Sequence, residues 1–541
     1  MLKIRRLLPL FFVGLLLMLS ACGGGEKSDE KASGKGFTTQ SGKGEAFTIA
    51  AGSENKVLEP LVEAFSKKTG YPVHIDYMGS LDIMRMLESG NPSYDALWPA
   101  SSIWLEMGDK DHLLKHTKTV ALTPVIFGIR KSLAEELGYV GRNDITIEEI
   151  SKAIADGKLR FAMTSATQSN SGASAYLAFL TSLSKNPQGG LTSEDLLDPS
   201  LQKKITHLLS GVNRSSGSSN WLVDLFLMGN YDAMVNYEQL IIQTNQALEK
   251  QGKEPLYAIY PIDGLSISDS PLAYVDHGKP KKEQCFLSFQ NDILSDQGQS
   301  FIESTGKRNA YGKVADKNRS QYKKEWGIDV DRTLSPIRLP QISVIEEALS
   351  LYQTSFKKPA YTAYVLDYSG SMEGVGNAEM IRAIQDVWIP ERAKENMLLG
   401  SDRDQTLFIP FSSFVMDVQS AEGADLSNLA SLAEKTSVGG GTALYEATAK
   451  AMEEMSKVSH LCENYSPAIV LLTDGKANGN MNFDQFAQIY QSYGLDIPIF
   501  SIQFGNANEK ELKNLAKLTH ARVFNGRKDL AEAFRSVKGY N

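Results

Sequence analysis

Short apolar runs alternate with longer amphipathic segments along most of the chain. Residues 47–50 form an apolar run that predicts a strand, and residues 57–69 repeat apolar side chains on one side at helical spacing. A second strand and a second helix are expected next, over residues 73–77 and 82–89. Strands that alternate with helices in this way are typical of α/β folds with parallel sheets.

The second half of the chain repeats this pattern after a connecting segment at 326–358. That connector begins with residues 326–329 and contains the prolines Pro336 and Pro340, which together predict an extended path. Residues 342–356 then carry a stripe of apolar side chains at helical spacing, so we expect a helix that docks on a flanking domain. Strands are expected beyond it at 360–366, 406–411, 468–472, 497–504 and 522–524.

The amino terminus differs from the rest of the chain. Residues 1–21 combine a basic start with an apolar run that is too short to span a membrane comfortably, as in a signal peptide. Residues 22–45 are rich in glycine and almost free of apolar side chains, which predicts a flexible tether. The soluble domains are therefore expected to begin near residue 46.

Length and composition bound what the chain can be. A chain of 541 residues should fold as two to four domains, and 42% hydrophobic with 22% charged residues is typical of globular protein. The formal net charge of -8 argues against nucleic acid or an anionic lipid surface as the main partner. Three cysteines leave no disulfide framework.

The residues Leu19, Ser20, Ala21 and Cys22 resemble the bacterial lipobox. The resemblance implies that Cys22 is diacylated and becomes the first residue of the mature protein. The chain would then be extracytoplasmic and held on the outer leaflet of the cell membrane by lipid alone. A cleaved signal peptide followed by an incidental free cysteine is the alternative.

Residues 46–325 resemble the extracellular solute-binding proteins of ABC importers, particularly the oxyanion-type branch. The likeness rests on the order of a strand, a serine-bearing turn at 51–55, a helix, the segment 94–102 and the later segment 229–238. It implies a bilobed α/β domain with a ligand cleft. Lobe 1 would comprise residues 46–122 and 272–325, and lobe 2 residues 124–267.

Candidate cleft residues are neutral donors at the expected starts of helices, together with one tyrosine. Hydroxyls and backbone amides in such turns can hold a dehydrated anion, and these turns contain no Arg or Lys. The same side chains could instead be ordinary helix caps, and the bilobed fold could persist without a small ligand. The candidates are Ser53, Ser80, Ser101, Ser102, Ser169, Asn170, Ser171 and Tyr237.

Three motifs near the carboxyl terminus resemble the von Willebrand factor A domain over residues 360–541. They are residues 367–371 after an apolar strand, 439–442 before a helix, and 473–475 after a second strand. The resemblance implies a doubly wound, Rossmann-like α/β fold with a metal-ion-dependent adhesion site. A glycine-rich turn that merely contains Asp and Ser is the alternative. The site residues would be Asp367, Ser369, Ser371, Thr442 and Asp474.

In that family the hydroxyls of Ser369, Ser371 and Thr442 bind Mg²⁺ directly, with Mn²⁺ or Ca²⁺ as alternatives, and the two aspartates act through water or hydrogen bonds. An acidic side chain of a protein partner takes the open coordination position.

Three function classes follow. The leading hypothesis is a non-enzymatic, membrane-anchored extracellular binding lipoprotein that combines metal-dependent protein interaction with capture of a small ligand, possibly an oxyanion. The alternative is the substrate-binding component of an ABC importer, with a permease as partner. A third hypothesis is metal-dependent hydrolysis at Asp367, although no serine-hydrolase elbow or zinc-protease motif is present in the sequence.

Overall fold

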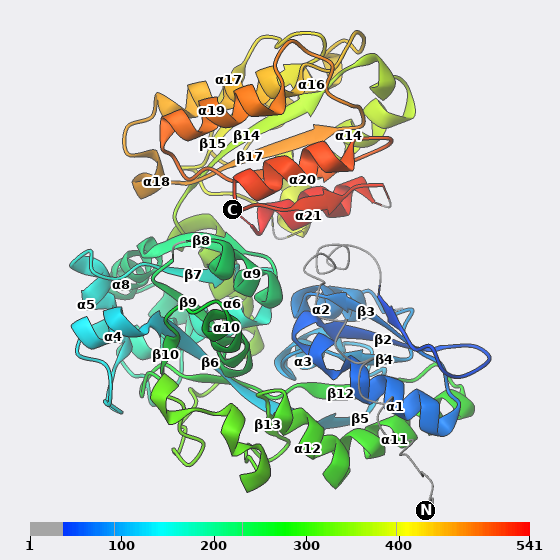
Figure 1. Ribbon diagram of the computed structural model, residues 1–541, viewed down its shortest axis with the longest axis vertical. Coiled ribbons are helices and arrows are strands. Elements are labelled where there is room, and N and C mark those ends of the chain that lie inside the picture. Colours follow the sequence, from blue (N-terminus) through cyan, green and yellow to red (C-terminus); the bar gives the residue numbers. More distant parts are fainter. Residues whose placement is uncertain (1–35, 91, 230, 397, 528, 541) are drawn as a thin grey trace, which may run out of the picture.

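The computed structural model describes residues 36–90, 92–229, 231–396, 398–527 and 529–540. Two lobes, between which the chain passes back and forth, precede a carboxy-terminal domain, and each of the three has its own sheet (Figure 1). The expected signal peptide and the acylation site Cys22 lie outside the described residues. Within the described ranges, no helix has both the length and the apolar character needed to cross a membrane.

Lobe 1 has a six-stranded sheet in the order β1-β3-β2-β4-β12-β5. Strands β2, β3 and β4 are parallel, whereas β12 returns antiparallel from much later in the chain. The elements are β1 Phe37–Thr38, β2 Phe47–Gly52, η2 Ser53–Leu58, α1 Glu59–Thr69, β3 Val73–Met78, α2 Ser80–Glu88, β4 Ala96–Trp98, α3 Ile103–Gly108, β5 Leu114–Thr119, β12 Pro271–Val275, α11 Pro280–Leu294 and α12 Asp296–Ser304.

Residues 36–45 pack on lobe 1, although their glycine-rich composition predicts a flexible tether. Strand β1 pairs with β3, and the Gln40 amide and the Ser41 hydroxyl each donate to the Glu63 carboxylate at 2.9 Å. Residues 36–45 are therefore part of the domain, which corrects the expected tether of 22–45. The prediction is wrong here because these contacts join residues far apart in sequence, and composition does not record them.

Lobe 2 has a sheet in the order β10-β6-β9-β7-β8, with β11 and β13 also paired to β6. Helix α6 is buried along nearly its whole length and forms the centre of this lobe. The elements are β6 Ala121–Arg130, α4 Lys131–Glu136, α5 Ile147–Ala155, β7 Phe161–Thr164, α6 Asn170–Leu183, α7 Ser193–Leu196, α8 Pro199–Ser210, β8 Val212–Ser216, α9 Ser219–Met228, β9 Ala233–Tyr237, α10 Glu238–Lys250, β10 Leu256–Ile259, β11 Ser266–Ser268 and β13 Arg308–Asn309.

The return to lobe 2 comes earlier than residue 325, where the sequence pattern ends lobe 1. Strand β13 pairs with the start of β6, and the Arg308 guanidinium donates to the buried Glu238 carboxylate at 2.8 and 2.9 Å. Two short helices follow, η3 Asp316–Gln321 and η4 Lys324–Trp326, and the side chains of Trp326 at the end of η4 and of Ile328 join the core of lobe 2. A two-residue strand carries too little periodicity for this crossing to be predicted.

The connector helix docks on lobe 2, as the apolar stripe predicts. It comprises α13, Ile342–Leu351, and the one-turn π-helix η5, Tyr352–Phe356. The Tyr176 hydroxyl of α6 donates to the Ala348 carbonyl at 2.8 Å, and the rings of Tyr176 and Tyr352 lie 5.1 Å apart. Only residues 357–359 then separate the connector from the first strand of the carboxy-terminal domain.

The carboxy-terminal domain is a doubly wound α/β fold, as the motifs predict. Its sheet has the order β16-β15-β14-β17-β18-β19 and is parallel except for β16. Helices α17, α19 and α20 pack on one face, and α14, α16 and α21 on the other. The elements are β14 Ala360–Asp367, η6 Gly370–Met372, α14 Val375–Trp388, α15 Pro390–Glu395, β15 Gln405–Phe411, β16 Gln419–Glu422, α16 Ser427–Lys435, α17 Leu444–Ser456, α18 Leu461–Asn464, β17 Ser466–Thr473, α19 Phe483–Tyr493, β18 Ile499–Gln503, α20 Glu509–Leu518, β19 Val523–Asn525 and α21 Leu530–Lys538.

Candidate functional site

The five predicted metal-site residues lie at the carboxyl ends of β14 and β17. Strand β14 is the point where the strand order reverses, because β15 lies on one side of it and β17 on the other. Open parallel sheets place ligands at such a point. Asp367 ends β14 with its side chain fully buried, and one carboxylate oxygen accepts the Ser369 amide at 2.8 Å.

Hydrogen bonds join the side chains of this cluster. The Ser369 and Ser371 hydroxyls lie 3.1 Å apart, and Ser371 donates to Asp474 Oδ1 at 2.6 Å. Thr442 approaches from the loop before α17: a Cβ added to Gly475 would lie 3.1 Å from Thr442 Oγ1 and 3.5 Å from Ser371 Oγ. The structure thus brings all five residues together, with Ser371 at the exposed edge.

Two further residues support this cluster. The Thr473 hydroxyl donates to the second oxygen of Asp367 at 2.6 Å and accepts the Gly475 amide at 3.1 Å. Asn478 Oδ1 accepts the Thr442 amide at 2.6 Å. A hydroxyl beside Asp474 in the motif could have indicated Thr473, whereas nothing in the sequence points to Asn478.

The donor set suits a hard divalent cation. Three hydroxyls and a neighbouring carboxylate are oxygen ligands of the kind that Mg²⁺ and Mn²⁺ accept together with water. Burial raises the pKa of Asp367, and the nearby Asp474 acts in the same direction, whereas hydrogen bonds from Ser369 and Thr473 oppose the rise. Within the described ranges, no three His, Cys, Asp or Glu side chains are grouped so that they could hold a metal ion, so the candidate site depends on hydroxyl ligands.

A cavity of about 790 Å³ lies where the two lobes and the carboxy-terminal domain meet. We call it the chamber. Three of the predicted cleft residues, Ser101, Ser102 and Ser171, are not among its lining residues. Those that do line it are Ser53, Ser80, Ser169, Asn170 and Tyr237.

Most of these predicted donors are already bonded within the protein. The Asn170 amide donates to Tyr237 at 2.9 Å and to Ser268 at 2.8 Å, and its oxygen accepts Trp104 Nε1 at 2.6 Å. The Ser171 hydroxyl lies 2.8 Å from both Thr164 and Ser219 in the interior of lobe 2.

Other members of the predicted set take part in hydrogen bonds that involve a backbone amide. Ser80 accepts the Ala100 amide at 3.0 Å, and the Ser102 amide donates to Asp269 at 2.8 Å. A structural role therefore accounts for several of the candidates.

The two lobes touch each other across the chamber. Asn220 Nδ2 of lobe 2 donates to the Ser53 carbonyl of lobe 1 at 2.6 Å, and Arg85 of lobe 1 donates to the Thr167 carbonyl of lobe 2 at 3.2 Å. The Ser53 and Ser218 hydroxyls lie 3.3 Å apart. The structure therefore describes the bilobed domain with its lobes in contact.

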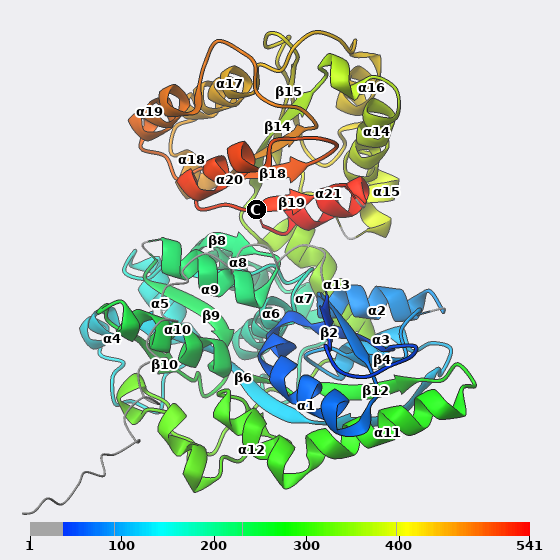
Figure 2. The same ribbon diagram turned by 45° about the vertical axis from the view of Figure 1, so that its right-hand side comes forward.

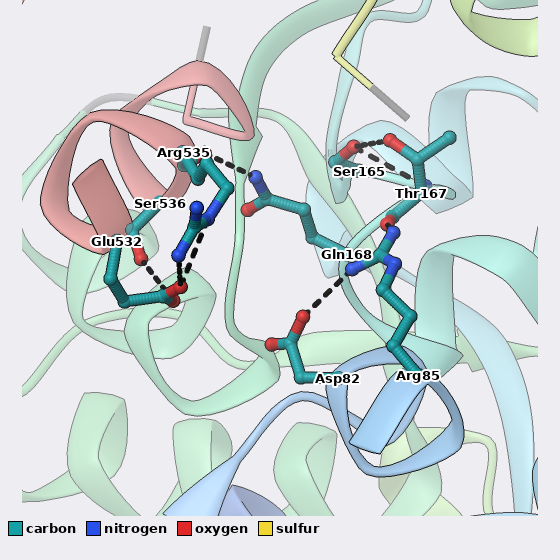
Figure 3. A network of polar contacts seen from close by, with 8 residues as sticks. All are labelled: Asp82, Arg85, Ser165, Thr167, Gln168, Glu532, Arg535 and Ser536. Atoms are coloured by element: carbon teal, nitrogen blue, oxygen red, sulfur yellow. Dashed lines mark hydrogen bonds and ion pairs between the residues drawn. The ribbon is translucent and has the colours of Figure 1, made fainter. Parts of the chain in front are cut away.

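The carboxy-terminal domain covers one side of this cavity with β19 and α21, which face the lobes in Figure 2. Figure 3 shows Gln168 of lobe 2 reaching α21, where its amide donates to the Arg535 carbonyl at 2.9 Å. Arg214 of lobe 2 donates to Asp496 at 3.1 Å and to the His520 carbonyl at 2.9 Å. No sequence pattern indicates that residues 522–525 and 529–540 contribute to a cavity with the lobes, because this contact joins segments far apart in the chain.

Two family models match consecutive parts of the chain. Residues 47–308 match the bacterial extracellular solute-binding protein family, and residues 363–534 match the von Willebrand factor type A domain. Among the curated proteins, none matches the chain.

Solved structures resemble each part separately. A periplasmic binding protein from Actinobacillus pleuropneumoniae with fructose-6-phosphate bound is 13% identical, with 56% of this chain and 93% of that chain covered and a TM-score of 0.41. The ferric binding protein from Campylobacter jejuni is 15% identical, with 57% and 98% covered and a TM-score of 0.39. A von Willebrand factor type A structure from Catenulispora acidiphila is 19% identical, with 34% and 43% covered and a TM-score of 0.28.

Proposed function

The chain joins a bacterial extracellular solute-binding domain to a von Willebrand factor type A domain, and we propose that it is a non-enzymatic binding protein of the cell surface. In this proposal the carboxy-terminal domain binds a protein partner through a metal ion, and the bilobed domain captures a small ligand. The observation that carries it is the convergence of Asp367, Ser369, Ser371, Thr442 and Asp474 at one edge of the sheet, where Ser371 is exposed.

Some residues at this edge would bind the cation directly, and others would help to keep it electrophilic. The hydroxyls of Ser369, Ser371 and Thr442 would be the direct ligands. The Asp367 carboxylate accepts hydrogen bonds from the Ser369 amide and the Thr473 hydroxyl. It would therefore act on the cation indirectly and not as a direct ligand. When bound, Mg²⁺ supplies an electrophilic position for an acidic side chain of the partner.

The metal assignment is tested by titration calorimetry of the full chain with Mn²⁺ and Mg²⁺. The double variant Ser369→Ala, Ser371→Ala should lose binding, while Ser427→Ala, an exposed serine on α16, should keep it. Unchanged binding in the double variant refutes the site. For the partner, proteins crosslinked to the chain on intact cells should be lost both with EDTA and in the double variant.

Delivery of a solute to an ABC permease is a second candidate function, favoured by the match of residues 47–308 to solute-binding proteins. It predicts uptake of a small molecule that fails when the gene is deleted. That uptake should be restored by a chain that carries the double serine variant, because transport would not need the metal site. Failure of the double variant to restore uptake would instead tie uptake to the metal site.

Attachment to the outer face of the membrane through Cys22 is the last part of the proposal. It is supported by the lipobox-like sequence that ends at this cysteine. Cys22→Ala should move the protein from the detergent phase to the aqueous phase in Triton X-114 partition. Cys285→Ala is a matched control because this cysteine is buried in lobe 1. A detergent-phase Cys22→Ala protein would contradict the lipid anchor.

A further inference from the structure

Among the described residues, more acidic than basic side chains line the chamber. The basic residues are Lys56, Arg85, Arg522 and Arg535. The acidic residues that line it are Glu54, Asp76, Asp82, Asp224, Asp529 and Glu532. They come from lobe 1, lobe 2 and the carboxy-terminal domain, so the excess of negative charge belongs to the chamber as a whole. A surface of one sign favours ligands of the opposite sign.

The basic side chains already have partners within the protein. Arg85 pairs with Asp82 at 2.8 Å, and Arg535 pairs with Glu532 at 2.9 Å, as Figure 3 shows. The Arg522 guanidinium lies over the rings of Trp221, Phe524 and Tyr540, 4.9 to 5.3 Å from their centroids. An incoming anion would have to compete with these contacts.

Lys56 is likewise engaged, because its ammonium lies over the Tyr77 ring at 5.4 Å from the centroid. The rings of Tyr77 and Trp221 belong to the chamber wall, and each already faces a cation of the protein itself. The negative face of an aromatic ring attracts cations in this way. The wall therefore combines carboxylates with aromatic faces that attract cations, and an incoming cation would compete there with Lys56 and Arg522.

Glu54 is the feature that singles out one place in this chamber. Its side chain lies at the start of η2 in lobe 1, lines the chamber and is only 5% exposed. One carboxylate oxygen, Oε1, has no hydrogen-bond partner among the described residues. That oxygen is closed to solvent while the lobes touch: a Cβ added to Gly52 would overlap it, and Gln239 of lobe 2 donates to the Glu54 carbonyl at 3.4 Å. A buried carboxylate oxygen without a donor is costly, so the position calls for a donor from outside the chain, which would reach it when the lobes part.

The surroundings of Glu54 define what that donor should be. The closest cationic influence is Lys307, whose ammonium donates instead to Asn55 Oδ1 at 2.9 Å. Burial raises the pKa of Glu54, and the field of Lys307 opposes the rise. A ligand ammonium would both donate to the free oxygen and add a second opposing charge, which a neutral hydroxyl would not do.

We propose that the chamber binds an organic cation, a primary amine whose ammonium group donates to Glu54, within walls that residues 522–540 of the carboxy-terminal domain complete. The inference rests on the proposed capture of a small ligand by the bilobed domain. It replaces the oxyanion expected from the serine-bearing turns with the opposite charge. A volume of about 790 Å³ is ample for such a molecule.

Calorimetric titration of the full chain tests the inference with three kinds of probe. The amines are ethanolamine, putrescine, spermidine and arginine; the anions are sulfate and molybdate; the neutral probe is glucose. At least one amine should bind, and Glu54→Gln, which keeps the shape of the side chain, should weaken that amine about tenfold or more. Glu106→Gln, at an exposed position on α3 of the same lobe, should leave the affinity unchanged.

The other outcomes separate the inference from the proposed function. Binding of an anion or of glucose without binding of any amine overturns the cation inference and leaves ligand capture standing. A blank across all probes contradicts both. If an amine binds the Glu54→Gln variant as tightly as it binds the unchanged chain, Glu54 does not anchor the ligand. Circular dichroism checks the fold of the variant. If Glu54→Gln does not fold, Glu54→Asp takes its place: it keeps the charge on a shorter side chain and should also weaken binding.

Discussion

Arg214 is the side chain through which we expect lobe 2 to hold the carboxy-terminal domain against the chamber. It is 7% exposed and donates across the domain boundary to the His520 carbonyl and to Asp496. The substitution Arg214→Ala removes both contacts and leaves the partners on the other domain. Only residues 357–359 link the two domains beyond the docked connector, so the domain would stay tethered while its docking weakens.

The magnitude follows from the surroundings of each contact. Asp496 is 52% exposed, so its ion pair with Arg214 is worth at most about 1 kcal/mol. The bond from the buried guanidinium to the His520 carbonyl is charge-assisted and is worth about 1.5 to 3 kcal/mol. A loss of about 2 kcal/mol would raise the ratio of undocked to docked molecules about 30-fold.

Amide hydrogen exchange of the full chain measures this effect. Arg214→Ala should speed exchange in the two surfaces that separate, residues 213–221 of lobe 2 and 522–540 of the carboxy-terminal domain. Arg382→Ala, at an exposed position on α14, is the matched control and should change neither. Unchanged exchange at both surfaces in Arg214→Ala would refute the reasoning that this residue holds the domain in place.

Three further predictions concern single side chains. Thr473→Val removes the hydroxyl that donates to Asp367 and should weaken Mn²⁺ binding in calorimetry, although Thr473 is not a proposed ligand; equal affinity would argue against its positioning role. Trp326→Ala should destabilise lobe 2 by about 3 to 5 kcal/mol in urea denaturation, since the indole is 1% exposed; a change below 1 kcal/mol would contradict its place in that core. Burial lowers the pKa of Lys307 to about 8 from the model-compound value of 10.5, so the folded state binds its proton less tightly than the unfolded state does. Between about pH 8 and 10.5, this group should therefore raise the free energy of unfolding by on the order of 3 kcal/mol. The Lys307→Met variant should lack this rise. If the free energy of unfolding changes with pH in the same way in both proteins, the prediction is wrong.

The edge that carries Asp367, Ser369, Ser371, Thr442 and Asp474, which we call the metal edge after the ion proposed there, was predictable because these residues lie in short motifs that resemble the von Willebrand factor A domain. Each motif follows or precedes a strong strand or helix pattern, and the carboxyl ends of parallel strands meet at one edge. Asp367 and Asp474 could therefore be paired without a structure. Asn478, which holds the Thr442 amide, lies in a loop whose position depends on tertiary packing alone.

The chamber was predictable only in part. Ser53 and Ser80 follow strands of lobe 1 and line the chamber, whereas Ser101 and Ser171 are buried and are not among its lining residues. A serine at the start of a helix looks the same in sequence whether it caps, packs or faces a ligand. Glu54 had no sequence signal, because burial and the lack of a donor appear only when both lobes are in place.

A short chain of contacts joins the metal edge to the chamber wall. Gly505, after β18, lies against Asp474, since a Cβ added there would be 3.0 Å from Asp474 Cβ. The Gly505 carbonyl accepts Arg527 Nε at 2.8 Å, and Arg527 follows Asn525, which lines the chamber. A movement of residues 522–540 would therefore be passed to Asp474 through Arg527 and Gly505.

Linkage provides the test of that route, because a ligand that changes the affinity for Mn²⁺ must have its own affinity changed by Mn²⁺ by the same factor. We expect the amine that binds the chamber to alter Mn²⁺ affinity in the full chain, and Arg527→Ala to reduce the effect. Lys510→Ala, on α20 of the same domain, is the control. Equal Mn²⁺ affinity with and without saturating amine would mean that the chamber and the metal edge act independently, although residues 522–540 belong to the same domain as the metal edge.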